Sequence, residues 1–110
     1  GGHGTANMTG NIIPQEMAVI SKPWRDDGDA FNCRETWLKN LPMLHFAYSE
    51  TNPVAVKSLM RVIDMPAGAL RRPLRPLNPQ ALQVGLDIVR NLELDKKYGY
   101  SLKPVLAAAE

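Results

Sequence analysis

The chain has 110 residues, 45% of them hydrophobic, which is enough to bury one modest core without disulfides or a metal. Thirteen basic and eleven acidic side chains give a formal net charge of +2, which disfavours nucleic acid or an anionic membrane as the main partner. Cys33 is the single cysteine, so there is no internal disulfide, and no apolar run is long enough to span a bilayer or to resemble a secretory leader. We expect a protein of the reducing cytoplasm.

Glycines and other small residues dominate the opening sequence, GGHGTANMTGNII. This composition predicts a turn that runs into a short strand and tolerates close backbone approach. Helices are predicted for the rest of the chain. A lone strand has no stability of its own, because its backbone donors and acceptors stay unpaired. We expect its partners from upstream sequence; the alternatives are a second copy or refolding of the segment into a loop.

Two helices are predicted next. Pro14 stands where a helix would begin, and an apolar stripe reaches Trp24, which predicts a helix over residues 14–24. From Asp29, apolar residues recur three and four positions apart, which predicts a long helix with one buried face. Pro42 lies inside this helix, where we expect a kink or a break. The aromatic residues of this region are interpreted as core: Trp24, Phe31 and Trp37.

A third helix is expected after a capping segment. Thr51 or Asn52 can cap it, and Pro53 can occupy its first turn. Its predicted buried positions are Val56, Leu59, Met60 and Ile63.

An extended strap is predicted over residues 71–77, because each of its prolines disfavours helix at the residue before it. Asn78 is then predicted to cap a final helix. The buried stripe of that helix is predicted to be Leu82, Leu86, Val89 and Leu92. Residues 95–110 have weak periodicity and are left as a tail of unknown structure.

Three ordered motifs resemble the dihydrodipicolinate synthase and N-acetylneuraminate lyase family. The opening GGHGTANMTGN, followed by Pro14, is similar to the family's GGxGxISVTANVxP. ETNPVAVK, at residues 50–57, resembles ETNPIPVK, and LRRPLRPL, at residues 70–77, resembles LRLPLxPL. Their order and separation also agree, and the likeness covers residues 1–94. Each motif alone is a weak signal, but the three in order strongly indicate the family.

The resemblance implies a fold. Members of the family are α/β proteins, (β/α)8 TIM barrels with extra C-terminal helices, and such barrels run to about 250 residues or more. It therefore implies that residues 4–12 are the last barrel strand and that residues 1–24 form the last strand and helix unit. Residues 25–94 would be the C-terminal helical extension, and the other seven strands are absent from this chain.

The resemblance also implies a chemistry. Family members form a Schiff base between a lysine on an earlier strand and a 2-keto acid, with a tyrosine for proton transfer and a threonine-containing loop for the carboxylate. None of those motifs is present, so we expect no catalytic residue, no cofactor, no metal and no activity of this chain alone. A Schiff-base lysine must be desolvated. The six lysines are interpreted as solvated side chains instead: Lys22, Lys39, Lys57, Lys96, Lys97 and Lys103.

One wall of a substrate pocket remains. The same match gives Ala6 the position whose backbone carbonyl faces the Schiff-base lysine, with Gly4, Thr5 and Asn7 around it. Ala6 and Asn7 replace the family's usual isoleucine and serine. A roomier, more polar wall suits an aldolase or dehydratase that acts on 2-keto-3-deoxy sugar acids. The expected partners of the parent are a small 2-keto acid, the upstream barrel and further copies in a homo-oligomer, since family members are commonly dimers or tetramers.

Other interpretations concern single residues and the chain as a whole. His3 has no second ligand at useful spacing and is interpreted as structural. The three strap arginines are expected to pair with surface carboxylates: Arg71, Arg72 and Arg75. The competing function is a non-enzymatic helical module, in which residues 14–94 form a small bundle for assembly or partner binding.

Overall fold

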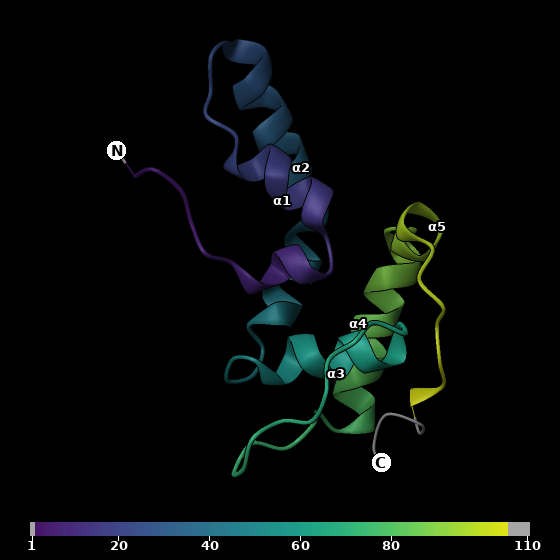
Figure 1. Ribbon diagram of the computed structural model, residues 1–110. Helices are drawn as coiled ribbons and strands as arrows, with labels where there is room; N and C mark the ends of the chain where they lie inside the picture. The colour runs from purple at the N-terminus through teal and green to yellow at the C-terminus, as the bar shows by residue number, and fades with distance from the viewer. Residues whose placement is uncertain (1, 106–110) are drawn as a thin grey trace.

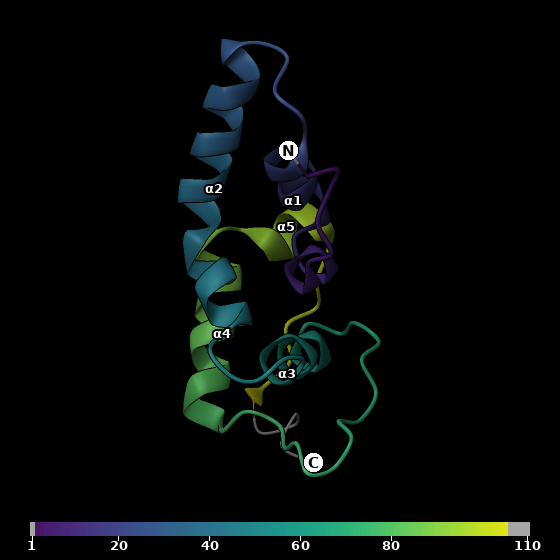
Figure 2. The ribbon, with the colours of Figure 1, turned by 90° about the vertical axis from the view of Figure 1, so that its left-hand side faces the viewer.

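The computed structural model describes residues 2–105, which form an elongated body of 48 × 29 × 20 Å (Figures 1 and 2). Within that range the chain contains helices and no strand. None of these helices is long and apolar enough to cross a membrane. The elements in chain order are η1 (Met8–Asn11), α1 (Pro14–Ser21), α2 (Asp27–Ala47), α3 (Val54–Val62), α4 (Pro79–Asn91) and α5 (Leu94–Tyr98).

The strand expected over residues 4–12 is not formed in this structure. Residues 2–6 make no backbone–backbone hydrogen bond with the rest of the described chain, and η1, a 3-10 helix, follows them. Figure 1 shows the segment before η1 leaving the helices on an extended path. A strand needs a neighbouring strand to pair with, and none lies within residues 2–105. The segment is therefore extended but unpaired.

The ends of α1 and α2 follow from local chemistry. Helix α1 stops at Ser21, before the predicted end at Trp24, because Pro23 holds the residue before it in an extended conformation. The Asp26 carboxylate caps α2 by accepting the backbone N–H of Asp29 at 2.8 Å. Helix α2 therefore begins two residues earlier than predicted.

Helix α2 runs without interruption through Pro42, so of the two expected outcomes, a kink or a break, the break does not occur. Pro42 is exposed. A hydrogen bond lost to proline costs least on the outer side of a helix, where water can replace it. The packing of the following turn, which buries Met43, Phe46 and Ala47, keeps the helix intact to its end.

The caps of α3 and α4 differ. The side-chain cap expected from Thr51 or Asn52 is absent, since Pro53 occupies the cap position of α3 and the turn is closed by a backbone bond from Val54 N–H to the Thr51 carbonyl, at 2.9 Å. The cap expected from Asn78 is confirmed: its side chain accepts the N–H at residue 81 at 2.8 Å. The strap at residues 71–77 is non-helical, as predicted.

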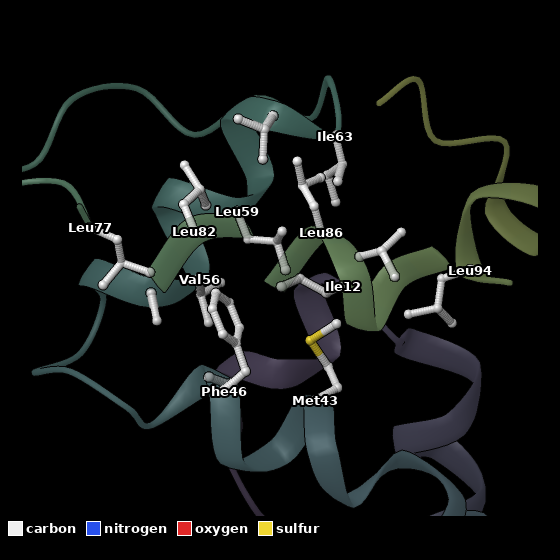
Figure 3. Packing of buried hydrophobic residues seen from close by; sticks show 14 of the residues in the cluster. Ile12, Met43, Phe46, Val56, Leu59, Ile63, Leu77, Leu82, Leu86 and Leu94 are labelled. Carbon is white, nitrogen blue, oxygen red and sulfur yellow. The ribbon is translucent and has the colours of Figure 1, made fainter. Parts of the chain in front are cut away.

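The core lies where the second half of α2, α3 and α4 meet, beside the turn that follows η1 (Figure 3). Gly85 is packed against the Phe46 ring so closely that an added β-carbon would lie 2.5 Å from the ring. Every predicted stripe residue of α3 and α4 lies in or against this core. Its fully buried large side chains include Ile12, Ile13, Met43, Leu59, Ile63, Leu86 and Leu94.

The segment after α4 folds back along the body. Leu94 is 2% exposed, so α5 joins the core. Beyond α5 the backbone N–H of Lys103 donates to the Val62 carbonyl at 2.7 Å, and its ammonium group pairs with Asp64 at 2.7 Å. The tail predicted over residues 95–110 thus has defined structure through residue 105, and residues 106–110 lie outside the described part.

Candidate functional site

The predicted pocket wall lies at the start of the described chain. Gly4, Thr5 and Ala6 are exposed in the extended segment, and Asn7 is half-buried. The Asn7 side chain accepts the backbone N–H of Thr9 at 2.8 Å and so caps η1. The four residues are thus consecutive in one largely exposed segment.

A tight turn joins this wall to α1. The Thr9 carbonyl accepts the backbone N–H groups of Ile12 and Ile13, each at 3.0 Å. All three residues are 0% exposed. The Thr9 hydroxyl is also buried, and it has no hydrogen-bond partner within residues 2–105. The turn is therefore closed by its own hydrogen bonds and anchored by three buried residues.

No lysine of the described chain is buried, as predicted from the sequence. Lys22 pairs with Asp29 at 2.8 Å, and its side chain is 55% exposed. Lys57 donates to the Ala69 carbonyl at 2.8 Å. A Schiff-base amine needs a desolvated pocket that keeps it neutral, and none of these environments supplies one.

A polar cluster, which the sequence interpretation did not identify, joins α1 to α5. It consists of Glu16, Lys97, Tyr98 and Tyr100. The Glu16 side chain is only 7% exposed, and its carboxylate pairs with the Lys97 ammonium and lies 2.8 Å from the Tyr98 hydroxyl at both oxygens. The Tyr100 hydroxyl donates to the Ile12 carbonyl. Buried charge is tolerated here because it is paired and hydrogen-bonded.

The environment of the two tyrosines changes their acidity. Burial, together with the hydrogen bond to Glu16 and its negative charge, raises the pKa of Tyr98 to about 12. Burial and the charge of Glu16 also raise the pKa of Tyr100. Both hydroxyls act as hydrogen-bond donors, Tyr98 to Glu16 and Tyr100 to the Ile12 carbonyl. A weak sequence signal for the cluster exists in retrospect, namely two tyrosines separated by one glycine in an otherwise featureless tail.

Trp24, Phe31 and Trp37 form an exposed aromatic surface, so their interpretation as core is wrong. They are 65%, 62% and 44% exposed. They line a surface pocket of about 470 Å³ with Cys33 and Arg34 on the first half of α2 and the loop before it. Periodicity identifies an apolar face of a helix but not whether another element covers it.

The remaining candidate residues are the strap arginines and His3. Arg71, Arg72 and Arg75 make no ion pair with a carboxylate of residues 2–105, contrary to expectation. His3 is exposed. Across the described chain, no three histidine, cysteine, aspartate or glutamate side chains gather in an arrangement that could hold a metal ion.

Comparison with known sequences gives a consistent result. The profile of the Dihydrodipicolinate synthetase family matches residues 1–91. A 4-hydroxy-tetrahydrodipicolinate synthase of Methanocaldococcus jannaschii is 30% identical over 94 residues, which is 86% of this chain and 32% of that protein. The protein of the same name from Methanococcus aeolicus is 35% identical over 74 residues, or 67% of this chain and 25% of the relative.

A solved structure agrees. The crystal structure of a dihydrodipicolinate synthase matches with a TM-score of 0.70 and 29% sequence identity, over 78% of this chain and 30% of that one. The chain thus spans about a third or less of the length of the proteins that it matches. The structural match therefore concerns 30% of the neighbour's chain and says nothing of its remainder.

Proposed function

The chain belongs to the dihydrodipicolinate synthetase family, and on that premise we propose that it is the C-terminal part of a Schiff-base-forming lyase that acts on pyruvate-type 2-keto acids. The observation that carries this proposal is the family match over residues 1–91, in the motif order described above. The solved dihydrodipicolinate synthase, with its TM-score of 0.70, supports a TIM-barrel parent.

In this proposal Gly4, Thr5, Ala6 and Asn7 line the substrate pocket. The extended and exposed conformation of Gly4, Thr5 and Ala6 supports it, because residues 2–6 make no backbone–backbone hydrogen bond within the described chain and could pair with a neighbouring barrel strand. Ends of barrel strands carry the active sites of TIM-barrel enzymes. The lysine and tyrosine of the reaction would come from upstream strands, and this chain supplies one wall.

The aromatic surface of Trp24, Phe31 and Trp37 fits the same proposal. Apolar surface of this kind marks a contact with another protein element. The upstream barrel and further copies of a cytoplasmic homo-oligomer are the proposed partners, and α1 and α2 are the elements that would meet them.

Borohydride trapping with pyruvate tests the proposal directly. The purified 110-residue chain is expected to give no adduct in an intact-mass spectrum, because its lysines are solvated and mostly ion-paired. The full-length protein that carries it is expected to give one adduct on a lysine outside these residues. An adduct on the chain alone, or none on the full-length protein, would contradict the proposal.

A second substrate class is favoured by Ala6 and Asn7, which replace the isoleucine and serine common in the family. The smaller Ala6 and the polar Asn7 would leave room for a hydroxylated substrate, such as a 2-keto-3-deoxy sugar acid. Steady-state kinetics of the full-length protein on pyruvate plus aspartate semialdehyde and on 2-keto-3-deoxygluconate decide between the two. Preference for the first pair would exclude the sugar-acid assignment.

The non-enzymatic module remains the alternative from another class, and the family match does not favour it. It predicts an upstream reading frame that lacks a threonine loop, a tyrosine and a Schiff-base lysine. A frame that encodes all three supports the lyase.

A further inference from the structure

The polar cluster ties two distant parts of the chain together. Glu16 lies in the first turn of α1, whereas Lys97, Tyr98 and Tyr100 come 81 or more residues later. We call these last three residues the C-terminal clamp. The family profile ends at residue 91, so the clamp lies outside the part of the chain that the family match explains.

Tyr98 completes a helix end that has no local cap. The first residue of α1 is Pro14, which has no N–H, and the cap residue Ile13 makes no side-chain hydrogen bond. The next backbone donor, the N–H of Gln15, donates to the Tyr98 hydroxyl at 3.0 Å. That hydroxyl in turn donates to Glu16. A capping function normally supplied by a neighbouring serine or aspartate is thus supplied by a distant tyrosine.

Tyr100 holds the residue at which η1 turns into α1. Its hydroxyl donates to the carbonyl of Ile12, a residue that is 0% exposed. The rings of Tyr98 and Tyr100 are stacked, with centroids 5.4 Å apart. Gly99 between them has a positive φ of 72°, a conformation that favours glycine and lets the chain reverse between the two rings.

The clamp therefore contacts Ile12, Gln15 and Glu16, which follow η1 in the chain. The pocket wall, residues 4–7, directly precedes η1. Only η1 separates Asn7 from Ile12, and that turn is closed by the Asn7 cap and by the two bonds to the Thr9 carbonyl. These bonds make η1 the short, hydrogen-bonded connection between residues 12–16 and Asn7.

We propose that Lys97, Tyr98 and Tyr100 are positioning residues, which lock the turn after the pocket wall by holding Ile12, Gln15 and Glu16 in place. The effect on the lyase reaction rests on the proposed function; the locking of the turn does not. The clamp touches neither substrate nor reacting atoms, and it acts through the placement of Ala6 and Asn7.

Hydrogen exchange of the 110-residue chain tests the lock. The double variant Tyr98→Phe, Tyr100→Phe keeps both rings and removes both hydroxyls, and Tyr48→Phe is the matched control, because Tyr48 is 57% exposed. We expect the amide of Gln15 to exchange about tenfold faster in the double variant, as for the loss of one hydrogen bond. The amide of Leu86 in α4 should keep its rate. Equal acceleration at Leu86, or no change at Gln15, would overturn the lock.

Kinetics of the full-length protein test the positioning effect. The same double variant is expected to lose about tenfold in kcat/KM for the keto acid, with Tyr48→Phe within about twofold of wild type, because small misplacements of binding groups carry large rate effects. Faster exchange at Gln15 with unchanged kcat/KM would overturn the effect on the reaction. If the wild-type full-length protein turns over no keto acid, the proposed function is refuted. The hydrogen-exchange rate of Gln15 would then be the test of whether the clamp holds the turn.

Discussion

The two halves of α2 have opposite surroundings. The second half buries Met43, Phe46 and Ala47 against α3 and α4. The first half presents Phe31 and Trp37, 62% and 44% exposed, beside Trp24. Figure 2 shows the first half of α2 standing beside α1 alone, whereas its second half lies near α3 and α4. One end of the molecule has a complete core within this chain, and the other end has an apolar face with no described element over it.

The largest difference in stability is expected between leucine-to-alanine substitutions at a buried and at an exposed position. Leu86 is 1% exposed in the core, and Leu38, next to Trp37 at the middle of α2, is 45% exposed. Leu86→Ala should lower the free energy of unfolding by about 2–5 kcal/mol, because it leaves a cavity. Leu38→Ala should change it by only about 0.5 kcal/mol. Urea denaturation followed by circular dichroism measures both, and similar losses would mean that the two positions do not differ.

The close approach of α4 and α2 can be probed at Gly85. Gly85→Ala should destabilise by about 1–3 kcal/mol, because the new methyl group meets the Phe46 ring, which lies 2.5 Å from the ideal β-carbon position. This outcome opposes helix propensity, which favours alanine by about 1 kcal/mol. Gly10→Ala is the control, since its β-carbon would meet only an ordinary contact at 4.0 Å. A stabilised Gly85→Ala variant would show that the Phe46 ring leaves room for a methyl group at residue 85.

The polar cluster joins the two ends, and alkaline pH should weaken it. Burial and the Glu16 carboxylate raise the pKa of Tyr98 to about 12 from its ordinary 10.0. Between these two values the unfolded state loses the tyrosine proton while the folded state keeps it, so the free energy of unfolding falls as pH rises. Tyr98→Phe should reduce this slope, and Tyr48→Phe should not. Denaturant midpoints between pH 9 and 12 measure it, and parallel curves for all three proteins would contradict the prediction.

The smallest effect on stability is expected at the aromatic surface. The double variant Phe31→Gln, Trp37→Gln should unfold within about 1 kcal/mol of wild type, because both side chains are largely exposed, at 62% and 44%. Its self-association should decrease, since exposed apolar patches drive contacts between molecules. Sedimentation velocity over a range of concentrations measures the change. A large loss of stability without altered association would place these residues in the core after all.

Much of the fold could be predicted from the sequence because it depends on neighbours a few residues apart. The cap at Asn78, the stripe of Leu82, Leu86 and Val89, and the non-helical strap all follow from such local rules. The predicted end of α1 at Trp24 is wrong, although the local effect of Pro23 on the residue before it explains the observed end at Ser21. The family resemblance, carried by three motifs, is confirmed by the profile match.

Which residues are buried could not be predicted in the same way, because burial depends on elements that are distant in the sequence. Composition predicts a short strand in the opening segment, and the family resemblance implies its bounds at residues 4–12, yet the segment has no neighbouring strand to pair with in residues 2–105. Trp24 and Phe31 were expected in the core because they are large and apolar, yet α1 leaves them uncovered. The pocket-wall role of Gly4, Thr5, Ala6 and Asn7 stays a prediction.

The sequence by itself determined the family from motif order and most helices from spacings of three and four residues. The absence of a buried lysine within residues 2–105 follows from the general preference of lysine for water. The tertiary structure alone decided that Glu16 meets Lys97 and Tyr98. The physical reason is that their contact spans more than 80 residues and depends on the path of α2 to α4 between them. No local periodicity encodes such a contact, and the same path leaves the aromatic surface at one end exposed.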